Sequence, residues 1–245
     1  MVFKLTAVLF ALGVLEPSLP LLAEEPAKRP AQSSHTEQLN FGPGGTIHLD
    51  GSYGDLKVEG WDRSEVEITV TKLTRYHDPQ QREPAQQRLE RIRVAAERRS
   101  DSELVINTMR SRRRLFAPLF ATVTDGVTVD YEIRAPRDSK LVIHHATGSV
   151  LVNNMAGDIE ATGQRGDIVL MLAASGKYSI DAKTKVGTVS SDFEGSARLR
   201  RYWLGERYAT NSPSSHRIHL RIGVGGITIK ALPPEAEPPV MARAQ

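Results

Sequence analysis

A short unit recurs along this 245-residue chain, and it constrains the fold more than any other feature. Each copy is a glycine followed within a few residues by alternating apolar positions. The copies are "GTIHLD" from Gly45, "GDLKVEG" from Gly54, "GSVLVN" from Gly148, "GDIEAT" from Gly157, "GDIVLM" from Gly166, "GKYSID" from Gly176, "GTVSSD" from Gly187 and "GITIKA" from Gly226. Side chains two residues apart on a strand share a face, so each unit predicts a short strand with one buried side. The glycine predicts a turn before the strand, because glycine adopts positive φ at little cost.

The alternating apolar residues form the predicted core: Ile47, Leu49, Leu56, Val58, Val150, Val152, Ile159, Ala161, Ile168, Leu170, Tyr178 and Ile180. Units spaced about eight to eleven residues apart fit two all-β architectures. One is a flattened right-handed β-solenoid-like repeat domain, and the alternative is an antiparallel β-sandwich. Near-identical units and the scarcity of Asn-Gly or Asp-Gly hairpin turns favour the solenoid.

The segments between the units predict further strands. Residues 65–75 alternate Val66, Ile68 and Val70 as a longer strand, and good helix formers after Pro84 predict one short helix. Two strands are expected around a turn at Ser100-Asp101, and two more around Pro136. We therefore expect a single Gly-rich β-repeat domain over residues 39–232, with short inserted loops.

The chain ends have a different character. Residues 1–23 combine Lys4, an apolar run from Leu5 to Leu15 and a possible cleavage point after Ala23, which is the layout of a signal peptide. An exported protein of the periplasm or cell surface is therefore expected. Residues 24–38 are polar and predict a flexible leader, and the Pro-rich residues 233–245 predict a disordered tail.

Several kinds of chemistry are disfavoured by the residues present. The chain has no cysteine, so disulfides and thiolate metal sites are excluded. The "GPGG" at 42–45 and "GVGG" at 223–226 lack a following helix and a Lys-Ser/Thr pair, so neither is a phosphate loop. His144 and His145 are adjacent and would face opposite sides of a strand, as would His216 and His219, so no metal or other cofactor is expected.

Three aspartates raise the question of catalysis. Asp55, Asp158 and Asp167 each follow a unit glycine, and paired carboxylates on a β-helix scaffold can hydrolyse glycans. The equivalent position holds Thr46, Ser149, Lys177 or Thr188 in other units. A polar residue that bonds a backbone N–H at the turn explains both the Asp and its replacements. A carbohydrate-active enzyme is thus the alternative to a non-enzymatic protein.

Two basic segments are the candidate ligand-binding sites. They contain Arg112, Arg113 and Arg114, and then Arg200, Arg201, Tyr202 and Trp203. Arginine beside aromatic rings suits anionic polysaccharides, lipid headgroups or an envelope protein partner. The net charge of +3 and pI near 9.2 are compatible with such ligands and do not require nucleic acid. The other interpretation is that these segments are solvated loops with aromatic side chains packed on the β core.

Longer stretches of the chain resemble a known family. "YGDLKVEGWDRSEVEITVTK", the segment from "VDYEIRAPRDSKLVIHH" to "GDIEATGQRGDIVL", and "GVGGITIK" are similar to the bacterial adhesin-like family called domain of unknown function 4097. The shared markers include Gly60-Trp61-Asp62 and Ala135-Pro136, and the likeness spans roughly residues 40–231. It implies a β-solenoid-like exported or envelope domain with no established catalytic residues. We expect a binding or structural role, with an accessory role in envelope stress or signalling as a further alternative.

Overall fold

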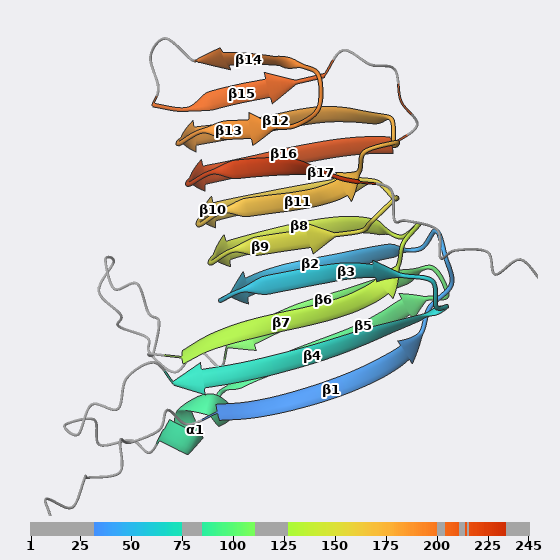
Figure 1. The fold of residues 1–245 in the computed structure, drawn as a ribbon. Helices are drawn as coiled ribbons and strands as arrows, with labels where there is room; N and C mark the ends of the chain where they lie inside the picture. The colour runs from blue at the N-terminus through green and yellow to red at the C-terminus, as the bar shows by residue number, and fades with distance from the viewer. Residues whose placement is uncertain are drawn as a thin grey trace, which may run out of the picture.

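The computed structural model describes residues 32–74, 85–110, 127–199, 204–210, 214 and 216–233, and these form two facing β-sheets and one short helix (Figure 1). The first half contains β1 (Gln32–Asn40), β2 (Thr46–Tyr53), β3 (Leu56–Trp61), β4 (Glu65–Thr74), α1 (Ala85–Glu90), β5 (Ile92–Ser100), β6 (Glu103–Arg110), β7 (Val127–Pro136) and β8 (Lys140–Thr147). The second half contains β9 (Val150–Asn153), β10 (Ile159–Arg165), β11 (Ile168–Ala173), β12 (Tyr178–Val186), β13 (Val189–Ser191), β14 (Ser196–Leu199), β15 (Glu206–Ala209), β16 (His216–Val224) and β17 (Ile227–Leu232). The all-β prediction is confirmed.

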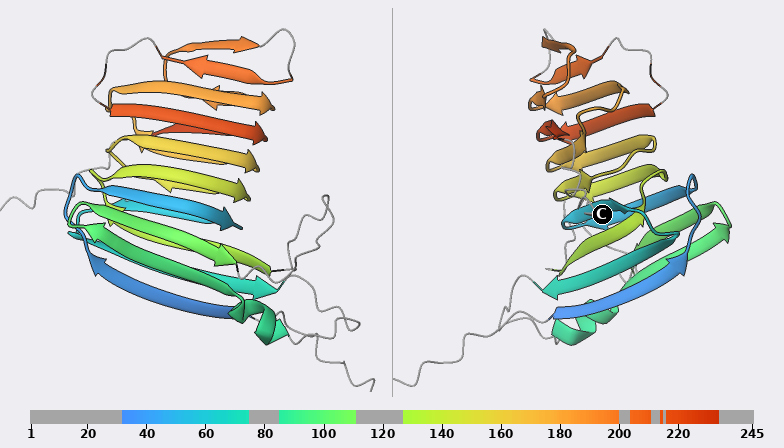
Figure 2. Two further views of the ribbon diagram at one scale, coloured as in Figure 1. Left: turned by 180° about the vertical axis from the view of Figure 1, so that it is seen from behind. Right: turned by 45° about the vertical axis from the view of Figure 1, so that its right-hand side comes forward.

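The strands are arranged in layers, each made of two strands that follow one another in the chain (Figures 1 and 2). Sheet A has the order β1-β4-β7-β3-β9-β11-β17-β13, and sheet B has the order β14-β15-β12-β16-β10-β8-β2-β6-β5. Each layer contributes one strand to sheet B and the next to sheet A. From one end to the other the layers are β6/β7, β2/β3, β8/β9, β10/β11, β16/β17 and β12/β13.

Neighbouring layers pair in parallel in both sheets, which is what stacked coils require and an antiparallel sandwich does not. Antiparallel pairs occur at the ends of the stack, where β4 and β1 extend sheet A and where β5, β15 and β14 extend sheet B. The layers do not follow chain order throughout. Layer β6/β7 lies outside β2/β3, and layer β16/β17 lies between β10/β11 and β12/β13, so a simple solenoid does not describe the whole molecule.

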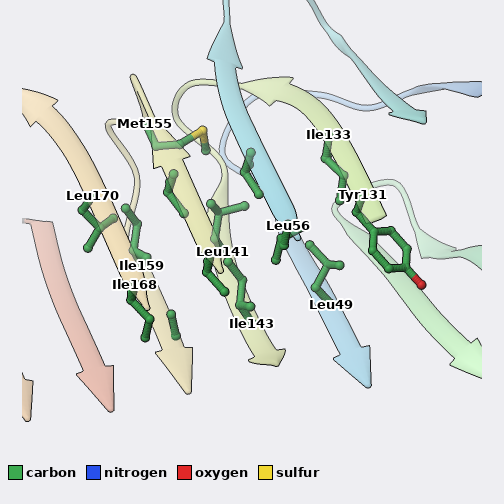
Figure 3. Close-up of a cluster of buried hydrophobic side chains, with 14 of the residues drawn as sticks. Leu49, Leu56, Tyr131, Ile133, Leu141, Ile143, Met155, Ile159, Ile168 and Leu170 are labelled. Atoms are coloured by element: carbon green, nitrogen blue, oxygen red, sulfur yellow. The ribbon is translucent and has the colours of Figure 1, made fainter. Parts of the chain in front are cut away.

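The core fills the space between the two sheets (Figure 3). Every predicted core residue is buried, from Ile47 in the first unit to Ile180 in the sixth. Val66, Ile68 and Val70 of β4 are buried as well, and Leu89 of α1 joins the same cluster. The predicted strand at 65–75, the helix after Pro84, the turn at Ser100-Asp101 and the turn near Pro136 all correspond to observed elements.

Five glycines stand one above another where each sheet B strand turns into its sheet A partner. In stacking order they are Gly54, Gly148, Gly166, Gly225 and Gly187, all with φ between 126° and 137°, and we call them the corner column. Backbones approach closely there: a Cβ on Gly166 would lie 1.9 Å from the carbonyl oxygen of Gly148. Only glycine satisfies both the positive φ and this approach, so the repeated glycine is explained by the stacking of layers.

Two of the sequence-based expectations are wrong in part. Alignment of the last unit on Gly226 is wrong by one residue, because Gly225 is the residue with positive φ at the corner. The flexible leader predicted for residues 24–38 is wrong from Gln32 onward, because β1 begins there and pairs with β4 over its whole length. The main-chain ladder to β4 orders this polar segment, which has no apolar alternation to reveal it. The predicted signal peptide of residues 1–23 and nearly all of the predicted tail lie outside the described residues.

Candidate functional site

The predicted ligand-binding residues Arg112, Arg113, Arg114, Arg200, Arg201, Tyr202 and Trp203 all lie outside the described residues. Their role therefore stays a prediction. The second segment is bounded by Leu199, the last residue of β14, and by Leu204, whose carbonyl oxygen accepts a hydrogen bond from the N–H of Gly187 at 2.8 Å. Other polar and charged residues are placed by the structure, and the candidate site consists of these.

The aspartates that follow the unit glycines bind backbone N–H groups of neighbouring layers. Asp55 Oδ1 accepts from the N–H of Ser149 at 3.1 Å, and Asp167 Oδ1 accepts from the N–H of Gly226 at 2.7 Å. Asp158 Oδ1 accepts from the N–H of Arg217 at 2.8 Å, at the opposite turn of the layer. The predicted binding of a backbone N–H is confirmed, but the N–H belongs to a neighbouring layer and not to the turn of the same unit, so these carboxylates join one layer to the next.

The histidines lie as the strand pattern predicts. His145 is buried, and this burial lowers the pKa of its imidazole below the usual value although backbone hydrogen bonds near Gly148 act in the opposite direction. His144 is exposed on the other face and lies 2.7 Å from Asp50, measured between Nδ1 and Oδ1. Across the described part of the chain, no three His, Asp or Glu side chains gather as a metal site would require.

Basic residues converge on the outer face of sheet B, toward the end of the stack. Arg221 of β16 is directly opposite Lys183 of β12, and Lys183 is directly opposite Arg207 of β15. Lys183 and Arg221 each lie between two buried residues, and the exposed Arg207 precedes the buried Tyr208, so all three point away from the core. We call these three residues the basic row. Like charges directly opposite one another on a sheet repel, so this arrangement costs stability.

A single carboxylate anchors the two arginines of the basic row. Asp181, two residues before Lys183 on the same face, accepts hydrogen bonds from Arg221 Nη2 and, at 2.9 Å, from Arg207 Nε. Partial burial raises the pKa of Asp181, but the two hydrogen bonds and the guanidinium charges outweigh it, and the pKa lies below its usual value. The carboxylate is therefore charged at neutral pH and holds both guanidinium groups in place.

A shallow hollow of about 320 Å³ opens beside the basic row. Gly223 takes the outward position after Arg221, so no side chain fills the space there. Lys185 borders the hollow, is exposed, and forms no ion pair with any described residue. We call this space the sheet B hollow. It is lined by Thr162, Gly163, Gln164, Lys183, Lys185, Arg221, Ile222 and Gly223.

On the outer face of sheet A, by contrast, basic side chains lie beside acidic ones. Lys57 Nζ lies 3.0 Å from Glu132 Oε1 and 3.8 Å from Glu59 Oε2, and Arg134 Nη1 lies 3.1 Å from Glu67 Oε1. Opposite charges therefore alternate across its strands. The accumulation of like charge beside the sheet B hollow is a local property and not that of the surface in general.

The basic row was missed from the sequence because its members are far apart in the chain. A signal was nevertheless present. Counting four residues back from each glycine of the corner column gives Asp50, His144, Thr162, Arg221 and Lys183 in stacking order, and these residues are opposite one another across sheet B. Only the layer order, which the sequence does not reveal, brings Arg221 and Lys183 together.

Comparisons with known proteins leave the family open. No helix in the described residues is both long and apolar enough to cross a membrane. No family model matches the chain, and no curated protein matches it. Among solved structures, a putative cell adhesion protein from Clostridium sporogenes is similar with a TM-score of 0.48 and 12% identity, over 83% of this chain and 100% of that one. A putative adhesin from Bacteroides fragilis has a TM-score of 0.24 and 12% identity, over 82% and 98%. A putative lipid binding protein from Parabacteroides distasonis has a TM-score of 0.21 and 11% identity, over 80% and 96%.

Proposed function

We propose that this chain is an exported, non-enzymatic binding protein that holds an anionic glycan against the outer face of sheet B. The observation that carries the proposal is the basic row beside the sheet B hollow, where Arg221, Lys183 and Arg207 lie directly opposite one another. A carboxylate, sulfate or phosphate group in the hollow would be within reach of these cations and relieve their repulsion. The open, shallow shape suits a charged group on an extended polymer.

The resemblance to domain of unknown function 4097 and the predicted signal peptide support placing this protein in the cell envelope. Arg200, Arg201, Tyr202 and Trp203 come between β14 and β15, and Arg207 of the basic row belongs to β15. We propose that this segment enlarges the same binding surface. A role without catalysis is supported by Asp55, Asp158 and Asp167, whose carboxylates are engaged with backbone N–H groups.

Isothermal titration of the full-length mature chain with dextran sulfate at low ionic strength tests the proposal, with neutral dextran as the reference ligand. Lys183→Ala/Lys185→Ala is expected to weaken binding at least about tenfold, because two ammonium groups that would bind sulfate are removed. Lys140→Ala/Lys230→Ala removes the same net charge from exposed positions elsewhere and should bind as the wild type does. Equally weakened binding in both double variants would show that binding is non-specific and would overturn the proposal.

Vesicles of phosphatidylglycerol separate the glycan from a lipid headgroup. The proposal expects tighter binding to dextran sulfate than to these vesicles, and the same double variant should affect both. Tighter binding to the vesicles, again abolished by replacing Lys183 and Lys185, would assign the site to lipid instead.

A further inference from the structure

The two sheets have four open edges, and three of them carry features that discourage pairing with another strand. In sheet A, β13 is only three residues long, and in sheet B, β14 is only four. At the other end of sheet B, β5 carries Arg93, Arg98 and Arg99 and has a register irregularity between Arg98 and Ser100. Short length, positive charge and bulges are the usual protections of an exposed sheet edge.

The fourth edge, β1, has none of these protections. It is nine residues long, contains no Lys, Arg or Pro, and keeps an unbroken register with β4 from Gln32 opposite Leu73 to Asn40 opposite Glu65. Eight of its nine residues are exposed, and no described strand pairs with its outer edge. Figures 1 and 2 show β1 as the outermost strand at this end of the molecule. A long, unbroken row of backbone N–H and C=O groups is therefore left available.

We propose that β1 pairs in an antiparallel manner with β1 of a second copy of this chain, with Thr36 at the centre of the pair. Such an interface is isologous, since the same strand contributes both sides, and it closes as a dimer. Sheet A would then continue from one copy into the other. The partner must be a strand that complements β1 on both faces, and β1 itself does so.

The inward-facing residues provide the specificity. Ser33, His35, Glu37 and Leu39 are opposite Lys72, Val70, Ile68 and Val66 of β4, so they share the face that the core uses. Only Leu39 packs against the core, and His35 and Glu37 remain exposed beyond the end of it. A generic strand added to this edge would leave the Glu37 carboxylate without an opposing partner.

A second β1 resolves this problem. In an antiparallel pair centred on Thr36, His35 of each copy lies opposite Glu37 of the other, so two complementary pairs form on one face. On the other face, Ser34 lies opposite Gln38, and both are uncharged. These outward residues already form hydrogen bonds with side chains of β4: Ser34 bonds Thr71 at 3.2 Å, and Gln38 donates to Glu67 at 2.7 Å. The edge is therefore ordered before a second copy arrives.

Sedimentation of the full-length mature chain over a range of concentrations tests the proposal. The wild type should form a reversible dimer. His35→Glu opposes Glu to Glu, and Glu37→Lys opposes Lys to His, so each variant alone should dimerise at least tenfold more weakly. An equal mixture of the two variants should dimerise, because the mixed pair has one contact between Glu at 35 and Lys at 37 and one His35–Glu37 contact as in the wild type.

Glu97→Lys on β5 makes the same charge change as Glu37→Lys at a different edge and should sediment as the wild type does. Circular dichroism checks that each variant is folded. A wild-type monomer at every concentration would overturn the proposal. So would full dimerisation of His35→Glu, or a mixture of the two variants that associates no better than either one alone.

Discussion

Two lines of residues run across the layers of this protein. One is the corner column, and the other consists of the outward residues four positions before each corner glycine. The two lines differ in what restricts the choice of residue. The corner column is glycine in each of its five layers, because a backbone carbonyl of the neighbouring layer occupies the space of a side chain. Four residues earlier, the outward positions are Asp50, His144, Thr162, Arg221 and Lys183, and no two are alike. The repeat dictates the first line and leaves the second free to vary, so the proposed ligand-binding residues Arg221 and Lys183 come from the second.

The largest effect is expected in the corner column. Gly166→Ala places a Cβ 1.9 Å from the carbonyl oxygen of Gly148 at a φ of 130°, so the layers must separate or the turn must change. We expect a loss of more than about 4 kcal/mol in the free energy of unfolding, or failure to fold. Urea denaturation measures it. Gly42→Ala is the matched control, since a Cβ there meets nothing within 4 Å. A small loss for Gly166→Ala would show that the column is not required for stacking.

An intermediate effect is expected one residue further along. Asp167→Ala removes the acceptor for the N–H of Gly226, and we expect a loss of about 1 to 2 kcal/mol in the same denaturation experiment. Asp167→Asn keeps an acceptor oxygen and should lose less. The fully exposed Asp101, which pairs with Arg98, serves as the reference aspartate, and its replacement by Ala should change stability far less. Equal effects at positions 167 and 101 would contradict the bridging role of Asp167.

The smallest effect is expected in the basic row. Lys183→Gln should change the free energy of unfolding by no more than about 0.5 kcal/mol, because its side chain points away from the core and relief of like-charge repulsion offsets the favourable interactions of its ammonium group. The measurement is again urea denaturation, without ligand and at low ionic strength. A destabilisation as large as that expected for Asp167→Ala would make Lys183 a structural residue and remove the contrast between the two lines.

Local features of the fold were predictable from the sequence because they are set within each unit. The burial of Ile159 and Ala161 and the turn at Gly166 follow from strand alternation and turn chemistry alone. That Asp167 binds a backbone N–H was predictable too, but its partner Gly226 in the neighbouring layer was not. The same reasoning identified β4 and α1, whose apolar spacing and helix formers are local as well.

Features that depend on which units are neighbours could not be predicted. Every corner in the column has a glycine and similar apolar neighbours. The sequence therefore does not show which layer stacks on which. The position of β16 between β10 and β12, and with it the meeting of Arg221 and Lys183, is therefore absent from the repeat pattern. β1 was missed for a different reason, since its order comes from backbone hydrogen bonds that any polar sequence can make.

The displaced layer order has a consequence for how the chain can acquire its structure. β16 and β17 are the last of the described strands to be synthesised, yet they separate layer β10/β11 from layer β12/β13. Until residues 216–232 are available, β12 lacks the strand on which it stacks, and one edge of β10 remains unpaired. The stack therefore cannot be completed by adding layers as they emerge, and long-range pairing of this kind is slow. The export that we propose would gain from this delay, because the finished fold waits for its own C-terminal strands.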